Sequence, residues 1–144
     1  MALNTEHLLR CIATLKASLA MLRGVRPETV EYEIYRNAVV KGFELTLETS
    51  VKLLRKALRP YTGSPRDVDA WTFKDTLRYA GKHGLMITGA VERWFKYRDN
   101  RNNTAHDYGV GFAEETVVLL PGFIEDAKSL EAALRERFSL HESD

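Results

Sequence analysis

The sequence predicts an all-α protein, an antiparallel bundle of about five helices that occupies residues 1–144 as a single domain. Three observations lead to this fold class. Apolar residues recur every three or four positions over long stretches, as they do on one face of a helix. The alternation of apolar and polar residues that is typical of a half-buried strand never extends beyond a few positions. Glycine and proline interrupt the apolar stripes where loops between helices are needed.

The first two helices are predicted over residues 5–23 and 28–59. Thr5 is the predicted cap of the first helix, and Gly24 follows its last turn. Pro60 ends the second helix, because proline lacks the amide hydrogen that a helix interior requires. The two apolar stripes consist of Leu8, Ile12, Leu15, Leu19 and Leu22 in the first helix, and Val40, Phe43, Leu47, Leu54 and Leu58 in the second.

A third helix is predicted over residues 65–80, with Ser64 as its cap and Pro65 in its first turn. A fourth helix begins near Val91 and continues into a polar segment at residues 97–108. Glycine is common between these two helices and is expected to break the chain there. The glycines in question are Gly81, Gly84 and Gly89.

The last helix is predicted over residues 113–138, after a turn formed by residues 109–111. Pro121 lies near its start, and we expect a kink at that point. Its apolar stripe consists of Leu120, Ile124, Ala127, Leu130, Leu134 and Phe138.

Charge is distributed unevenly along the chain, although the formal net charge is only +1. Residues 1–112 carry 18 basic and 12 acidic side chains, whereas residues 113–144 carry 3 basic and 8 acidic ones. A basic face that meets a phosphate backbone is compatible with this asymmetry, but the chain lacks the strong basic excess of general nucleic-acid binders. Composition therefore leaves RNA binding open.

Cysteine content and hydropathy exclude several classes of protein. Cys11 is the only cysteine, so neither an intramolecular disulfide nor a zinc site built on several thiolates is expected. The histidines at positions 7, 83 and 141 have no carboxylate or cysteine at ligand spacing, and we predict no metal and no cofactor. No apolar run approaches the ~18 residues that cross a membrane. The expected location is the reducing cytoplasm.

The candidate site is the polar segment Arg101-Asn102-Asn103-Thr104-Ala105-His106-Asp107-Tyr108. If the helix continues through it, Arg101, Ala105 and Tyr108 share one face. Arg101 and His106 are five positions apart and would project about 140° from one another. A loosened final turn, or a partner chain that supplies one of the two residues, would bring them together.

The pair has the side-chain chemistry that RNA cleavage without a metal needs. His106 can exchange a proton with a ribose 2′-hydroxyl or a leaving oxygen near neutral pH. Arg101 is a permanent cation whose planar fork fits phosphate oxygens, and Asn102 can orient either group. From these residues alone, a solvated helix end with a capping histidine is the simpler interpretation.

The pattern Arg-Asn-x-x-x-His-x-Tyr at positions 101–108 resembles the signature of HEPN-domain proteins, specifically the toxins of HEPN/MNT toxin–antitoxin pairs. The segment from Tyr35 to Glu48, with Lys52 after it, resembles the long helix of the nucleotidyltransferase substrate-binding-like family. Ser64-Pro65-Arg66 and Leu119-Leu120-Pro121 also resemble that family. The resemblance covers roughly residues 30–135.

This resemblance implies a two-fold homodimer in which the Arg and His segments of both chains face each other across a cleft. It implies a metal-independent ribonuclease, acting on tRNA or other cellular RNA, in a module similar to type II or type VII toxin–antitoxin systems. By position, Arg101 and His106 would be catalytic and Asn102 would support them. Tyr108 would be adenylylated by a cognate MNT nucleotidyltransferase antitoxin, which neutralises the toxin.

Several other residues have two interpretations each. Lys96 and Arg98 make the approach to the motif basic, which either guides RNA or keeps the helix soluble, and we predict that they bind RNA. Trp71 and Trp94 are predicted in the core or at a dimer interface rather than as base-stacking platforms. Cys11 is predicted to be a small buried apolar residue.

Three functional hypotheses remain. The leading one is the ribonuclease toxin. The alternative is a non-catalytic subunit that binds a nucleotide or another substrate for a separate nucleotidyltransferase, and the third is a bundle with a purely structural role. Replacement of His106 with alanine separates the first two, because only the first predicts loss of RNA cleavage.

Overall fold

The computed structural model describes residues 3–104 and 110–139, and it leaves the side chains at positions 65, 101–104, 110–113 and 139 undescribed. Within these residues every regular element is helical, which confirms the predicted all-α class. Six α-helices and one short 3₁₀ turn follow one another along the chain. They are α1 (Glu6–Arg23), α2 (Val30–Leu58), η1 (Arg59–Tyr61), α3 (Pro65–Asp69), α4 (Phe73–Lys82), α5 (Thr88–Thr104) and α6 (Val110–Ser139).

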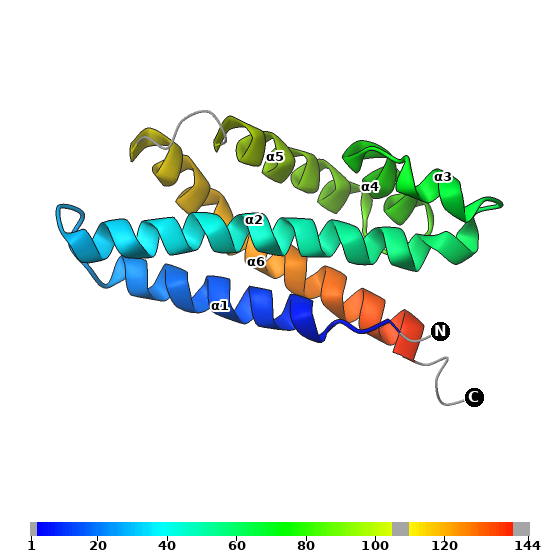
Figure 1. The fold of residues 1–144 in the computed structure, drawn as a ribbon, viewed down its shortest axis with the longest axis horizontal. Coiled ribbons are helices and arrows are strands. Elements are labelled where there is room, and N and C mark those ends of the chain that lie inside the picture. Colours follow the sequence, from blue (N-terminus) through cyan, green and yellow to red (C-terminus); the bar gives the residue numbers. More distant parts are fainter. Residues whose placement is uncertain (1–2, 105–109, 140–144) are drawn as a thin grey trace.

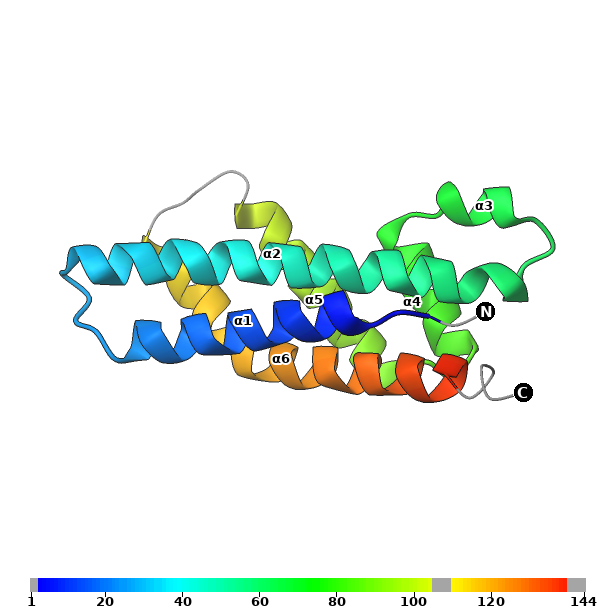
Figure 2. The same ribbon diagram turned by 60° about the horizontal axis from the view of Figure 1, so that its bottom comes forward.

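Three long helices, α1, α2 and α6, pack against one another, and the shorter helices lie along this group (Figure 1). α1 and α2 run antiparallel and side by side, as both views show (Figures 1 and 2). A Cβ atom on Gly42 of α2 would lie only 3.3 Å from Leu15 Cδ1 of α1, so glycine permits the close approach of these helices. α5 packs against α4, α2 and α6, and this arrangement places the approach to the motif beside two of the long helices.

The core consists of the apolar stripes that the sequence predicts. All five stripe residues of α1 and all six of α6 are buried. In α2 the buried residue at the start of the stripe is Val39, whereas Val40, which was predicted there, is only half-buried. Phe43 of α2 meets Phe123 of α6 edge to face, with ring centroids 4.8 Å apart. Aromatic contacts thus join the helices that the stripes bring together.

The prediction of a single third helix over residues 65–80 was wrong, because this segment forms two helices, α3 and α4. The break falls before Thr72, whose hydroxyl accepts a hydrogen bond from the Asp75 amide while the Asp75 carboxylate accepts one from the Thr72 amide. This reciprocal capping box starts a new helix at Phe73. α4 includes Gly81 and ends at Lys82, and Gly84, two residues later, takes a φ of 75° that favours glycine. α5 then begins at Thr88, three residues before the predicted start.

The last helix also begins earlier than predicted. α6 starts at Val110, so Val110 and Gly111 belong to a helix rather than to the predicted turn. The helix continues through Pro121, and its axis changes direction within its first half in Figure 2. A change of direction near an internal proline agrees with the missing backbone hydrogen bond at that residue.

Thr5 occupies the predicted N-cap position of α1, but its side chain forms no capping hydrogen bond. Its hydroxyl donates instead to Oε2 of Glu131 on α6, at 2.7 Å. Glu131 is only 2% exposed and also accepts a hydrogen bond from Arg135 Nε at 3.0 Å. A buried carboxylate needs such donors, and here they tie the start of α1 to the end of α6. No helix in the described ranges is both long and apolar enough to span a membrane.

Candidate functional site

The helix that leads into the motif, α5, is held in the bundle by aromatic contacts. Trp94 is fully buried, and its ring meets those of Tyr97 and Phe123 at centroid distances of 5.8 and 5.5 Å. Tyr97 also contacts Phe123 edge to face, at 5.0 Å. Edge-to-face contacts add stabilisation beyond the burial of apolar area. The first three turns of α5 are therefore fixed against α6.

A charged cluster reinforces the same contact. The Asp126 carboxylate on α6 accepts two hydrogen bonds from the Arg93 guanidinium, both at 2.8 Å, and one from the Tyr97 hydroxyl at 2.5 Å. Burial, the hydrogen bond to Asp126 and the charge of Asp126 raise the pKa of Tyr97, and the charge of Arg93 opposes this rise. Burial alone would raise the pKa of Asp126, but the hydrogen bonds from Arg93 and Tyr97 outweigh it and hold that pKa below its usual range. The cluster is therefore a charge-assisted clamp between α5 and α6.

One turn further along α5, a polar contact takes over from the aromatic ones. Asn100 Nδ2 donates to Thr116 Oγ1 at 3.0 Å, and both side chains are buried between α5 and α6. Asn100 directly precedes Arg101, so this hydrogen bond fixes the backbone at the start of the motif. Asn100 is one of three asparagines in the polar segment, and nothing in the sequence distinguishes it from its polar neighbours.

The predicted catalytic residues lie at the edge of what the structure describes. Arg101 and Asn102 occupy the last turn of α5, and their side chains lie outside the description. His106 and Tyr108 lie outside the described residues. The arrangement of Arg101, His106 and Tyr108 therefore remains a prediction.

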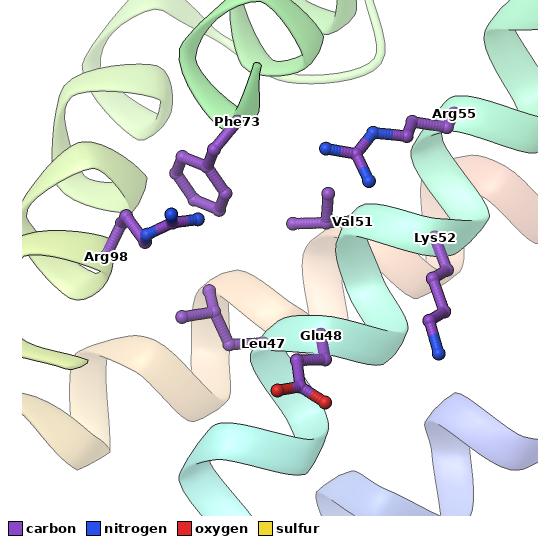
Figure 3. Close-up of a pocket in the computed structure, with 7 residues that line it drawn as sticks. All are labelled: Leu47, Glu48, Val51, Lys52, Arg55, Phe73 and Arg98. Carbon is purple, nitrogen blue, oxygen red and sulfur yellow. The ribbon is translucent and has the colours of Figure 1, made fainter. Parts of the chain in front are cut away.

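Next to the motif, on the side of α5 that faces α2 and α4, the structure contains a cavity of about 180 Å³. Figure 3 shows Arg98 of α5 and Arg55 of α2 extending toward the space beside Phe73 and Val51. The lining combines cationic, apolar and acidic side chains from three helices that are distant in sequence. The complete lining is Leu47, Glu48, Val51, Lys52, Arg55, Phe73 and Arg98.

The two residues predicted to bind RNA lie in different places. Arg98 lines the cavity, and its guanidinium carbon lies 5.0 Å from the centroid of the Phe73 ring. A guanidinium over an aromatic face is attracted by the negative charge of the ring. Lys96 is exposed and belongs to a shallow depression between α5 and α6, together with Asp99 and Glu115. The structure thus separates Lys96 from Arg98.

Two further cations of the cavity come from α2. Arg55 donates from Nε to Thr76 Oγ1 at 3.3 Å and from Nη2 to the Trp71 carbonyl oxygen at 3.2 Å. Lys52 is exposed and also lines the cavity, with its side chain extending away from Arg55 and Arg98 in Figure 3. Lys52 was placed in a family pattern from the sequence, and Arg55 was missed. The available signal was the spacing of three, which puts both residues on one side of α2.

The remaining predictions can be compared directly with the structure. Trp94 lies in the core as predicted, whereas Trp71 is half-buried and stacks on Tyr79 with ring centroids 4.2 Å apart. Cys11 is half-buried, and its sulfur lies 3.7 Å from His7 Nε2, so His7 has a cysteine within reach, contrary to the prediction. Among the residues whose positions are described, no three His, Cys, Asp or Glu side chains gather as a metal site would require.

Comparisons with known proteins agree with this architecture. Residues 4–136 match the family described as nucleotidyltransferase substrate binding protein like. A Haemophilus influenzae protein named probable ribonuclease HepT is 32% identical over 113 residues, which span 78% of this chain and 75% of that protein.

Solved structures give the same result. A Haemophilus influenzae protein, described as having the fold of a substrate binding domain of a nucleotidyltransferase, matches with a TM-score of 0.79 and 25% identity over 92% of this chain and 99% of the other. A tri-AMPylated HEPN toxin from Shewanella oneidensis, solved with an MNT antitoxin, matches with a TM-score of 0.64 and 16% identity over 91% of this chain and 98% of the other. At 16% identity, this second likeness concerns the fold alone.

Proposed function

Because the chain belongs to the nucleotidyltransferase substrate-binding-protein-like family, we propose that it is a metal-independent ribonuclease that acts as the toxin of a two-component module in the cytoplasm. One observation carries this proposal. The spacing of Arg101, His106 and Tyr108 occurs in a chain that is 32% identical to a protein named probable ribonuclease HepT. The contacts of Trp94 and Asn100 support it, because they fix α5 up to the residue before Arg101.

The proposed reaction needs one proton carrier and one cation. His106 takes the proton of a ribose 2′-hydroxyl, and the 2′-oxygen attacks the adjacent phosphorus. The bond from phosphorus to the 5′-oxygen breaks, and that oxygen takes up the proton that His106 had accepted. Arg101 stabilises the negative charge that develops on the phosphorane, and Asn102 orients the pair. The products are a 2′,3′-cyclic phosphate and a 5′-hydroxyl end.

The proposal includes a two-fold homodimer in which Arg101 of one protomer acts with His106 of its partner. Such an arrangement removes the angular separation of about 140° that a continuous helix gives the two positions. Mixing the inactive variants Arg101→Ala and His106→Ala tests it. A heterodimer would contain one site with both native residues, so activity should return. If both residues act within one chain, the mixture stays inactive.

Regulation is proposed to act on Tyr108 through an MNT-family nucleotidyltransferase. Transfer of AMP from ATP to the tyrosine oxygen releases pyrophosphate and places a phosphodiester beside the site. Added bulk and negative charge there would repel the RNA backbone. The antitoxin complexes of the Shewanella oneidensis fold relative motivate this step.

The ribonuclease proposal is tested by incubating purified wild-type and His106→Ala protein with total cellular RNA in EDTA. Discrete products on a denaturing gel from the wild type alone support it, and mapping them decides between tRNA and other cellular RNA. Intact RNA in every lane contradicts it. The positively charged Lys96 and Arg98 are proposed RNA contacts, and their replacement should weaken binding to any RNA sequence.

A second function is favoured by the family description and by the Haemophilus influenzae fold relative, both of which name substrate binding for a nucleotidyltransferase. In that case the chain binds a nucleotide or another substrate and performs no chemistry. His106→Ala would then change the affinity for that ligand and leave RNA intact with or without the substitution.

A further inference from the structure

The cavity between α2, α4 and α5 lies outside the proposed catalytic segment, and its chemistry is that of a phosphate site. We propose that it binds the phosphodiester group of single-stranded RNA that neighbours the group to be cut. This inference rests on the proposed ribonuclease function. Its ligand contacts would come from Lys52 and Arg55 of α2 together with Arg98 of α5.

The charge of the lining favours an anion. Three cationic side chains and one carboxylate, that of Glu48, line the cavity. Neither Lys52 nor Arg55 forms an ion pair with a carboxylate in the described part of the chain. A cavity whose cations exceed its carboxylates attracts phosphate and focuses the field at its opening.

Arg55 is already held in a binding orientation. Its Nε and Nη2 atoms are occupied by the Thr76 hydroxyl and the Trp71 carbonyl oxygen, both neutral acceptors. The guanidinium therefore keeps its full charge, and neither of these two hydrogen bonds uses the hydrogens of Nη1. Because this side chain is ordered before the ligand arrives, binding would cost little additional conformational entropy.

The size of the cavity limits what enters. At about 180 Å³ it is smaller than the sites of roughly 300–1,000 Å³ that hold whole drug-sized ligands. A phosphate with part of its ribose matches this volume better than a complete nucleotide. Leu47, Val51 and Phe73 supply an apolar wall suited to the carbon face of a sugar. The site would read backbone rather than base sequence.

The place of the cavity links it to the cut. Arg98 precedes Arg101 by three residues on α5, which corresponds to about 4.5 Å along the helix axis and to adjacent positions on its surface. A phosphate held by Arg98 and a second one held at Arg101 would thus belong to neighbouring nucleotides of one strand. The cavity would fix the register of the strand before cleavage.

The test measures binding of a fluorescently labelled single-stranded RNA to the His106→Ala protein, which leaves the RNA uncut. The variant is Lys52→Gln, and the matched control is Lys56→Gln, an exposed lysine one turn further along α2 that does not line the cavity. We expect Lys52→Gln to weaken binding several-fold and to reduce the slope of log K against log salt by about 0.7, the value for one phosphate contact on a single strand. Lys56→Gln should leave both quantities unchanged.

Equal slopes for the two variants overturn the cavity proposal. Competition with inorganic phosphate distinguishes a site for an RNA phosphodiester from a site for the free anion. If phosphate at low millimolar concentration displaces the RNA, and this displacement depends on Lys52, the proposal that the cavity binds RNA is overturned. Cleavage by the His106-containing protein is measured in parallel. If the protein cleaves RNA and the two lysine variants have equal salt slopes, the cavity proposal is contradicted and the ribonuclease proposal stands. If the protein does not cleave RNA and Lys52→Gln alone lowers the salt slope, the ribonuclease proposal is contradicted and the cavity still binds RNA. Absence of any RNA binding removes both.

Discussion

The two sides of α5 have opposite chemistry. Toward α6, the buried side chains of α5 are held by the rings of Trp94 and Tyr97, the Asp126 cluster and the Asn100–Thr116 hydrogen bond, and a shallow depression at Lys96 lies beside them. Toward α2 and α4, the same helix borders a cavity lined by cations. The first side holds the helix still, and the second places a cationic side chain of α5, Arg98, at the cavity. The difference indicates a division of labour between a scaffold and a binding surface.

This division has a measurable consequence. Substitutions on the α6 side should lower the free energy of unfolding, and those on the cavity side should lower RNA binding without changing stability. A variant that does both would show that the two surfaces are not separate.

Trp94→Ala should have the largest effect. Its side chain is fully buried between Tyr97 and Phe123, so truncation loses apolar burial and leaves a cavity. The expected loss of unfolding free energy is about 3–5 kcal/mol, measured by chemical denaturation. Glu92→Ala, an exposed position on the same helix, is the control and should change stability by less than about 0.5 kcal/mol. Equal effects of the two substitutions would refute the packing of α5 described above.

Tyr97→Phe tests the Asp126 cluster while keeping the aromatic ring. It removes one hydrogen bond to a carboxylate, and the expected cost is about 1.5–3 kcal/mol. A pH series sharpens the test. Because the pKa of Tyr97 is raised in the folded state, its protonated hydroxyl contributes fully to the free energy of unfolding below the ordinary pKa of 10.0. This contribution is lost as the pH rises further. The difference between wild type and Tyr97→Phe should therefore shrink at high pH, and a constant difference would contradict this assignment.

Thr116→Val tests the contact next to the motif with little change in volume. The Asn100 amide loses this acceptor in a buried position, and the expected cost is about 1 kcal/mol. Because Asn100 precedes Arg101, RNA cleavage should fall further than stability alone explains. Thermal unfolding and cleavage rates measured on the same protein separate the two effects. Thr116→Ser, which keeps the hydroxyl, should restore cleavage.

Lys52→Gln should have the smallest effect on stability. The side chain is exposed and has no ion pair with the described carboxylates, so the expected change in unfolding free energy is within about 0.5 kcal/mol. The effect should instead appear in RNA binding. A loss of stability comparable to that of Tyr97→Phe would mean that the cavity side also belongs to the scaffold.

The helical stripes made most of the fold predictable from the sequence. Leu8 to Leu22 in α1 and Leu120 to Phe138 in α6 are buried at the predicted spacing, since one face of each long helix must leave water. The division between α3 and α4 was also present in the sequence, as Thr72 followed three positions later by Asp75. The longer apolar pattern around it concealed this capping signal.

The surroundings of the motif were less predictable. The burial of Asn100 depends on Thr116, which lies in another helix, so a polar residue in a polar segment gives no local sign of it. The cavity likewise joins Lys52 and Arg55 to Arg98, more than forty positions later in the chain. Such contacts follow from helix packing, whereas the spacing of Arg101 and His106 is local and is visible in the sequence itself.

The central claim is that the protein uses His106, and no metal, to make a 2′-hydroxyl of the RNA attack the adjacent phosphorus. A modified substrate tests it most directly. An RNA that contains the mapped cut site is compared, in EDTA, with the same RNA carrying a single 2′-deoxynucleotide on the 5′ side of that cut. The account predicts cleavage of the first, with a 2′,3′-cyclic phosphate end, and no cleavage of the second. Equal cleavage of both substrates, or cleavage that survives His106→Ala, would contradict it.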